Sequence, residues 1–481
     1  VGDVAISKGE VSFPEFIPKW RPTYYRFTAN GDARAMLSIL DEKPLTLLSK
    51  VNLSPTQFSG GANAVVEIMR PNKRDVASEE YGYSGVATFE NMAISELIGD
   101  VNFTNAKGKV DLKTRSMTVT ADAEFTDGAP IDLSWTQRFY REDGPSEINI
   151  AGVFDSTTGD WFGISPRQFV VGPVDFKARA LGELGDFKTL DVDADFTAAV
   201  IKLDALGWRK PDNIPASGAL KLRFADEGVH VDALKIDAGD YANINGALLF
   251  NANGALQSAS ITDFSLAGAA DLNIRAERDP AGVLVFTAVG PFLNAGAMIE
   301  QMLNGSSAEK DEPFPWGTGM ALNARVDEIA MREGVTYMDG ALDLRRDAER
   351  LQALNFTAFD ENGTPLRAAM SLTGAGEGPQ RAIAAETREL GALMAGVFGL
   401  KSVAGGEGVL RLMLNSGEAA GFSGELEARR LQVINAPLLA RILSAGSLDG
   451  LANLLSGEGI EFDYAAGEFE YANGVLLIDE L

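Results

Sequence analysis

The sequence predicts a mainly β protein, in which a long, curled antiparallel β-sheet of repeat-like hairpins forms an open groove with a few short amphipathic α-helices, mostly toward the C-terminus. Three observations predict this class: apolar and polar residues alternate over many segments, glycine-containing turns divide these segments, and few windows have helical periodicity. Alternation places one set of side chains on each face of a strand. An antiparallel sheet can have one apolar face and one face exposed to water, an arrangement that a parallel sheet normally does not allow.

Alternation recurs in several stretches, notably 110–113, 117–121, 190–196, 220–224 and 229–231. Strands of about 8–10 residues would number on the order of 30 here, and at about 4.8 Å per strand one sheet would run for over about 100 Å. Such a sheet must twist and curl, and if it does not close, its apolar face becomes an elongated trough. The candidate lining residues are apolar members of alternating strands: Leu220, Leu222, Phe224, Val229, Val231, Leu248 and Phe250.

Turns with glycine separate the apolar runs and predict hairpins. Glycine accepts the positive φ that tight hairpins need, and Asn or Asp often precedes it. Several of these turns lie about 26–29 residues apart, as in an array of hairpins. The predicted turns are Asp226-Glu227-Gly228, Asn253-Gly254, Ala281-Gly282, Glu333-Gly334, Asn362-Gly363 and Asn473-Gly474.

Helical periodicity is confined to four short windows. Residues 33–40 predict a helix that ends before Pro44, and 294–304 predict a second. The windows 387–400 and 436–456 carry apolar stripes, which we expect to cap the sheet or cover its trough, because amphipathic helices usually pack on their own protein. The polar, proline-containing segment 304–315 predicts a linker or an exposed loop.

The chain of 481 residues is too long for one ordinary compact core. We expect three segments. Residues 1–150 form an N-terminal β-rich segment, 151–305 form a β-hairpin array, and 306–481 form a C-terminal region of strands and capping helices.

Composition excludes several classes of partner and chemistry. The formal net charge of −26 repels phosphate backbones, so no nucleic acid partner is expected. The chain has no cysteine and one histidine, His230, which leaves no thiolate or multi-histidine metal site. Asp191-Val192-Asp193-Ala194-Asp195 lacks the glycine and glutamate of a calcium loop and is typical of the wet face of a strand. We expect no metal and no cofactor.

No motif predicts an enzyme. The glycine-rich pieces match neither the dinucleotide fingerprint nor the P-loop, and no nucleophile elbow is present. A pair of glycosidase carboxylates among the 68 acidic residues stays an alternative, although most of these residues alternate on solvated faces. We therefore expect no catalytic residues.

The C-terminal stretch carries the most specific motif. An apolar helix precedes Gly457-Glu458-Gly459-Ile460, an aromatic strand follows, and Gly474-Val475-Leu476-Leu477-Ile478-Asp479-Glu480 ends the pattern. This order resembles the C-terminal region of the AsmA-like family, and the segment from Glu389 to Gly408 resembles its helix-then-glycine-pair element. Segments near the N-terminus, Met36–Asp41 and Ala129–Trp135, resemble the central region of the YhdP-like branch.

The resemblance implies a Gram-negative envelope protein in the periplasm, anchored to the inner membrane through an N-terminal helix that we expect outside this sequence. It also implies a bridge-like lipid transfer protein that carries phospholipid, or another acyl-chain lipid, between the inner and outer membranes, with an outer-membrane contact. The expected function is to hold acyl chains in the apolar groove. The alternative is a structural or assembly factor for outer-membrane proteins or envelope integrity, without lipid conduction.

Overall fold

The structure is a computed structural model in which the following residues are described: 4–14, 21–42, 48–49, 53–77, 80–98, 101–126, 128–155, 168–183, 186–303, 319–347, 351–373, 380–413, 422–434, 460–472 and 475–480. The chain forms two compact units. The first comprises Val1–Ile201 and Pro211–Asp237, and the second comprises Lys202–Lys210 and Ala238–Leu481. The expected division into three segments stays a prediction.

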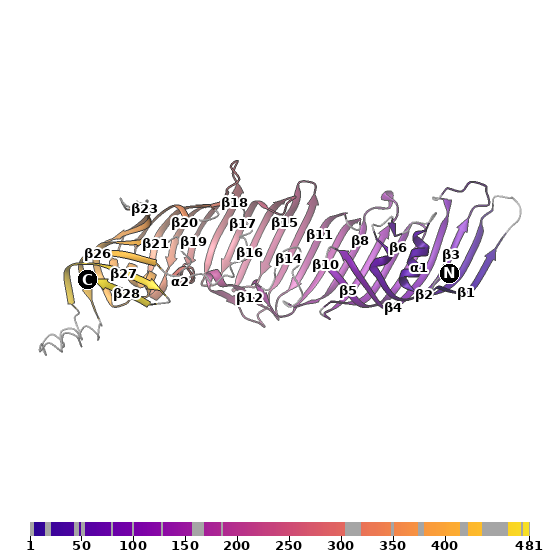
Figure 1. Ribbon diagram of the computed structural model, residues 1–481, viewed down its shortest axis with the longest axis horizontal. Helices are drawn as coiled ribbons and strands as arrows, with labels where there is room; N and C mark the ends of the chain where they lie inside the picture. Colours follow the sequence, from indigo (N-terminus) through magenta and orange to yellow (C-terminus); the bar gives the residue numbers. More distant parts are fainter. Residues whose placement is uncertain are drawn as a thin grey trace. The chain divides into compact units, whose positions relative to one another are not determined.

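The first unit is built on one antiparallel array of strands (Figure 1). Each strand pairs with the next in chain order, apart from the short β9 and β12, which pair with each other outside this array. The strands of the array are β1 (Val4–Ser12), β2 (Thr23–Asp32), β3 (Phe58–Arg70), β4 (Gly82–Ile98), β5 (Val101–Lys113), β6 (Ser116–Phe125), β7 (Pro130–Arg138), β8 (Ser146–Phe154), β10 (Val174–Glu183), β11 (Asp186–Asp195), β14 (Ser217–Ala225) and β15 (Gly228–Asp237). The first unit also contains β9 (Val170–Val171), which pairs with Val200 and Ile201 at the start of β12 (Val200–Leu203), whereas β13 (Trp208–Lys210) belongs to the second unit.

The second unit has the same construction with one exception. Its strands are β16 (Ala242–Asn251), β17 (Leu256–Leu266), β18 (Ala270–Arg278), β19 (Leu284–Asn294), β20 (Gly319–Ala330), β21 (Thr336–Asp347), β22 (Leu351–Asp360), β23 (Pro365–Thr373), β24 (Gln380–Thr387), β25 (Val403–Met413), β26 (Phe422–Val433), β27 (Ile460–Ala472) and β28 (Val475–Glu480). All neighbours pair antiparallel except β19 and β20, which are parallel. Parallel neighbours need a long crossover, and the end of β19 at Asn294 is far enough in the sequence from the start of β20 at Gly319 to allow one.

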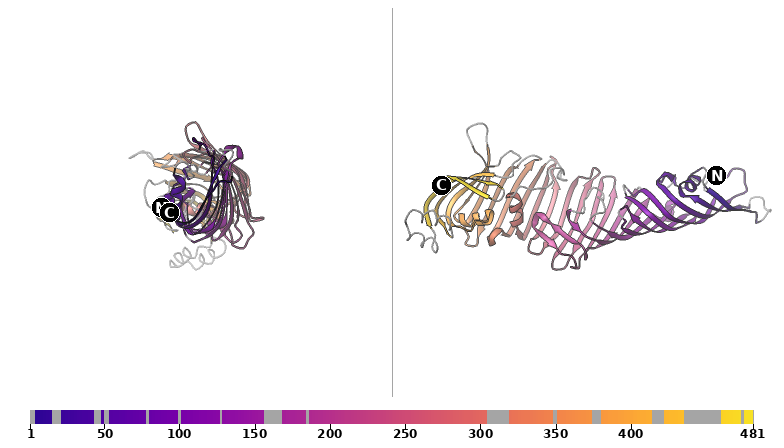
Figure 2. Two further views of the ribbon diagram at one scale, coloured as in Figure 1. Left: turned by 90° about the vertical axis from the view of Figure 1, so that its right-hand side faces the viewer. Right: turned by 60° about the horizontal axis from the view of Figure 1, so that its bottom comes forward.

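The described helices confirm three of the four predicted windows. They are α1 (Ala33–Asp41), α2 (Gly296–Leu303) and α3 (Leu390–Phe398). Helix α1 begins where the Asp32 carboxylate accepts a hydrogen bond from the Ala35 amide, at 3.0 Å. Figure 2 shows α1 on the inner side of the curve that the strands of the first unit make. The fourth window, 436–456, and the expected linker at 304–315 lie outside the described residues.

The glycine turns fall between paired strands, as the sequence predicted. Gly254, Gly282 and Gly363 have φ values of 77°, 84° and 80°, and each lies in the loop of an antiparallel hairpin. The Asp226–Gly228 and Glu333–Gly334 turns join β14 to β15 and β20 to β21. The sixth turn, Asn473-Gly474, lies outside the described residues. The mainly antiparallel β class is therefore confirmed, with one parallel pair that the sequence analysis did not predict.

Candidate apolar binding surface

One apolar row crosses the first unit from strand to strand. Its members stand directly opposite one another in the register of each successive pair of strands, so their side chains share a face. We name the following residues the first apolar row: Ala29, Ala64, Ala87, Val110, Val119, Trp135, Ile148, Ala180, Leu190, Leu222 and Val231. No polar residue interrupts this row between β2 and β15.

Burial changes along this row. Trp135 and Ile148 are buried, and they belong to a core that includes an aromatic cluster, defined as Phe103, Phe125, Trp135, Phe154 and Phe176. Phe125 lies between Phe103 and Phe176, with ring centroids 5.7 Å and 6.4 Å away. Helix α1 packs on the same core through Ala33, Leu37 and Leu40. The sheet therefore fills this part of its apolar face with its own side chains.

On β11, β14 and β15 the apolar face is half-exposed. Leu190 and Leu222 lie opposite each other, and so do Val192 and Leu220. All four are only partly buried. We name the following residues the half-exposed rows of the first unit: Leu190, Val192, Leu220, Leu222, Phe224, Val229, Leu234 and Ile236. Leu190 at one side of this surface packs against the core of the neighbouring strands, and Phe224 is the aromatic member of these rows.

Five of the seven candidate lining residues lie together on this surface. Leu222 stands opposite Val231 and Phe224 stands opposite Val229, with Leu220 on the same face of β14. Val231 is buried, at 7% exposure, and the other four are half-exposed. The remaining two, Leu248 and Phe250, lie on β16 in the second unit, where they pack beside a small core of Leu256, Ala276 and Leu284.

The second unit carries a longer apolar row. We name the following residues the second apolar row: Gly246, Ile261, Ile274, Ala288, Ala324, Leu342, Phe356, Ala368, Ala385, Leu410, Leu426 and Gly467. It crosses the parallel pair without a break, because paired residues of parallel strands also share a face. Beside it, Leu322, Leu344 and Leu354 form a second line of half-exposed leucines on β20, β21 and β22.

Helix α3 covers part of the second unit's apolar face. Leu393, Met394 and Phe398 are buried in one core with Leu410 and Ala428 of the sheet. The helix lies close to the strands because Gly391 has no side chain, and a methyl group there would lie 2.6 Å from the Ala404 Cα atom. This confirms for α3 that an apolar helical stripe packs on its own sheet.

The C-terminal end of α3 is held in place by polar contacts. Gly399 ends the helix in the left-handed conformation, with φ 74°. The Arg332 guanidinium donates a hydrogen bond to the Val397 carbonyl oxygen at 3.0 Å, and Lys401 forms an ion pair with Glu333. This ion pair lowers the pKa of the Glu333 carboxyl, mainly through the hydrogen bond from Lys401. We therefore regard α3 as a fixed cover.

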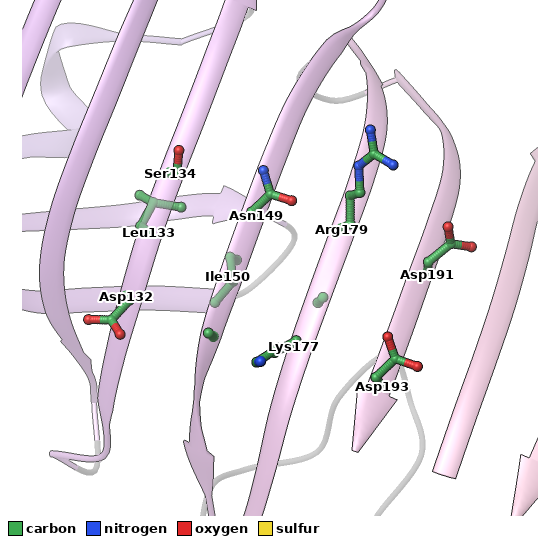
Figure 3. A pocket seen from close by; sticks show the side chains of 11 residues that line it. Asp132, Leu133, Ser134, Asn149, Ile150, Lys177, Arg179, Asp191 and Asp193 are labelled. Atoms are coloured by element: carbon green, nitrogen blue, oxygen red, sulfur yellow. The ribbon is translucent and has the colours of Figure 1, made fainter. Parts of the chain in front are cut away.

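The opposite face of the first unit is polar. A shallow pocket there is lined partly by Asp132, Lys177 and Asp193, and by Asn149 and Arg179 on the next line of residues (Figure 3). Arg179 is already paired with Glu147, with 2.9 Å between Nε and Oε1, and its hydrogen bond lowers the pKa of the Glu147 carboxyl. The carboxylates of Asp132 and Asp193 offset the positive charge of Lys177. The pocket therefore resembles a solvated strand surface more than an anion-binding site.

The acidic strand of residues 191–195 and the single histidine also place polar side chains on this solvated face of the sheet. Asp191 and Asp193 of the expected acidic strand line the pocket on β11. His230 stands opposite Arg223, and its Nε2 atom lies 3.2 Å from Glu227 Oε1. Within the part of the chain that the structure describes, no three His, Asp or Glu side chains gather as a metal site. In that same part, no helix has the length and apolarity needed to cross a membrane.

Sequence reasoning missed much of the apolar surface. Leu190 and Val192 belong to the alternating stretch 190–196, which was interpreted through its acidic residues and not through its apolar ones. The leucine line of β20, β21 and β22 also alternates, as in Leu342-Asp343-Leu344. Applying the period-two rule to every segment would have found both groups.

Comparison of the chain with known protein families, curated proteins and solved structures gives no match.

Proposed function

We propose that this chain is a segment of a bridge-like lipid transfer protein, which holds phospholipid acyl chains on its apolar sheet face while they pass between the inner and outer membranes. The observation that carries the proposal is the continuity of the two apolar rows, each unbroken by a polar residue over its strands. The half-exposed residues beside them offer an apolar surface to a ligand. This role is binding and conduction rather than catalysis.

The energetics of an acyl chain suit such a surface. Each buried CH₂ group contributes about 0.8 kcal/mol, so one long chain gains on the order of 10 kcal/mol. A surface of similar residues repeated from strand to strand offers successive sites of similar affinity. An acyl chain can then move across strands without a single deep trap, while its headgroup stays in solvent. No specific polar residue is required.

The motif resemblance supplies the cellular setting of the proposal. The glycine pair Gly405-Gly406 lies in β25 beneath α3, with φ values of 58° and 84°, and Ile460-Glu461-Phe462 opens β27. Residues 455–459 and 473–474 of the motif lie outside the described residues. We propose membership of the AsmA-like family in its YhdP-like branch, and hence a periplasmic location with attachment to the inner membrane in the full-length protein.

Two adjacent leucines on β16 allow a matched test. Leu248 lies on the apolar face opposite Ala259, whereas Leu249 lies on the other face opposite Ser258, and both are half-exposed. The chain would be purified without detergent and its bound lipid quantified by mass spectrometry. We expect stoichiometric phospholipid in the wild type, its loss in Leu248→Asp, and its retention in Leu249→Asp. Leu222→Asp should repeat the loss in the first unit.

Circular dichroism would establish that each variant is folded. Absence of lipid from the wild type, or equal retention in Leu248→Asp and Leu249→Asp, would contradict the proposal. Cross-linking in the cell envelope would then show whether the chain contacts an outer-membrane protein, as an assembly factor would.

A further inference from the structure

Several glycines on the apolar faces lie beneath a large side chain from a neighbouring strand or loop. On β5, a methyl group at Gly108 would lie 2.6 Å from the Phe89 Cζ atom, and on β16 one at Gly246 would lie 2.5 Å from Ile261 Cδ1. On β8, one at Gly152 would lie 2.8 Å from Ile131 Cγ2. At Gly108 and Gly152 a backbone oxygen of the neighbouring strand lies closer still, at 2.3 Å and 2.6 Å, so backbone as well as side chain excludes a methyl group there.

Gly218 shows this arrangement most cleanly. It lies on β14 two residues before Leu220, opposite Ala194, and therefore on the same face as the half-exposed rows. A methyl group at Gly218 would lie 2.6 Å from the Phe196 Cε2 atom, and its three nearest neighbours are all atoms of that ring. The backbone is not in the left-handed region. A methyl group at this position would therefore clash with the Phe196 ring, and none of its three nearest neighbours is a backbone atom.

The position of the ring controls how closely a ligand chain can pack. Carbon atoms pack best at about 3.5–4.0 Å, so a methyl group at Gly218 would displace the Phe196 ring by about 1 Å or more. A gap of 0.5–1 Å at the surface already removes roughly a quarter to a half of the dispersion energy of each atom pair. A raised ring would therefore hold an acyl chain away from the neighbouring leucines.

We propose that Gly218 and Phe196 together set the depth of the apolar surface on β14, and that they are positioning residues for a bound acyl chain. This inference rests on the proposed lipid-binding function. It assigns a role to a glycine that carries no side chain for the ligand to touch. The same arrangement at Gly246 and Ile261 extends the principle to the second unit.

The test compares four purified chains: wild type, Gly218→Ala, the double variant Gly218→Ala/Phe196→Ala, and Gly61→Ala. Gly61 lies on β3, and a methyl group there would meet nothing within 4 Å, so it controls for the loss of glycine flexibility in a strand. Each chain is incubated with limiting dioleoylphosphatidylcholine vesicles, the vesicles are removed by flotation, and bound lipid is quantified by mass spectrometry. Urea unfolding checks the fold of each chain.

We expect Gly218→Ala to weaken binding about four-fold for each methylene group of the acyl chain that is no longer buried. The double variant should recover binding to within about two-fold of the wild type, because the ring no longer stands above the surface, and Gly61→Ala should bind like the wild type. Equal binding by Gly218→Ala and the wild type would overturn the inference and leave the proposed function intact, as would a double variant as weak as Gly218→Ala. A wild-type chain that binds no lipid would overturn both.

Discussion

On the first apolar row, Trp135 and Ile148 are 6% and 3% exposed, whereas Leu190 and Leu222 of the same row are half-exposed. All four residues are apolar, all lie in paired antiparallel strands, and all point to one face. Their difference in burial arises from what stands beside them. Trp135 belongs to one core with Phe125, Phe154 and Phe176, while Leu222 stands between Leu190 and Val231 and has Leu220 and Phe224 beside it on β14.

Alternation therefore specifies an apolar face but not whether the protein fills that face itself. The aromatic cluster stabilises the fold, because its side chains are removed from water by one another. The half-exposed rows contribute less to stability, because part of their apolar area stays in contact with solvent. Single substitutions can separate these two roles, from the largest expected effect to the smallest.

The largest effect is expected in the aromatic cluster. Phe176→Ala should destabilise the first unit by about 3–5 kcal/mol, because it removes a buried ring and leaves a cavity. Leu222→Ala should cost about 1 kcal/mol, since only part of that side chain is buried. Urea unfolding followed by tryptophan fluorescence measures both values. Equal decreases in stability would show that the two regions are one core, and the distinction between them would fail.

An intermediate effect is expected where α3 covers the second unit. Gly391→Ala places a methyl group 2.6 Å from the Ala404 Cα atom and 2.7 Å from the Val403 carbonyl oxygen, and neither backbone atom can move away easily. We expect a loss of about 1–3 kcal/mol from overpacking. Gly396→Ala is the matched control, since its nearest neighbours are side-chain atoms at 3.4 Å. If both variants unfold at the same urea concentration, close backbone packing does not hold α3.

The smallest effect concerns Tyr337, a 1% exposed residue of the core beneath α3. Its hydroxyl has no hydrogen-bond partner among the described residues, and burial raises the pKa of the phenol. At pH 7, Tyr337→Phe should raise stability by up to about 1 kcal/mol, because it removes an unpaired buried polar group.

The pH dependence of Tyr337 has a definite sign. Because its folded pKa is raised, its contribution to stability is present below about pH 10, the unfolded pKa, and is lost as pH rises above that value. Wild-type stability should therefore fall above pH 10 more steeply than that of Tyr337→Phe, as measured by urea unfolding across that range. Parallel pH profiles for the two chains would show that the phenol ionises without cost and that α3 does not seal this core.

The sequence by itself determined the features that depend on neighbours along the chain. Period-two alternation specified which side chains share a face, the glycine turns specified where hairpins reverse, and apolar stripes marked α1, α2 and α3. These signals are local, because strand and helix periodicity act within a few residues. They were sufficient for the β class and for placing Leu220, Leu222 and Phe224 on one face.

Only the tertiary structure decided which parts of that face are filled. The sequence did not show that β20 would pair parallel to β19, because that depends on the path of the connecting crossover. Nor did it show that Phe196 would lie over Gly218, or that Val231 would be buried while Val229 is half-exposed. Burial of a side chain depends on the size and position of residues on other strands, and these are set by register and curvature.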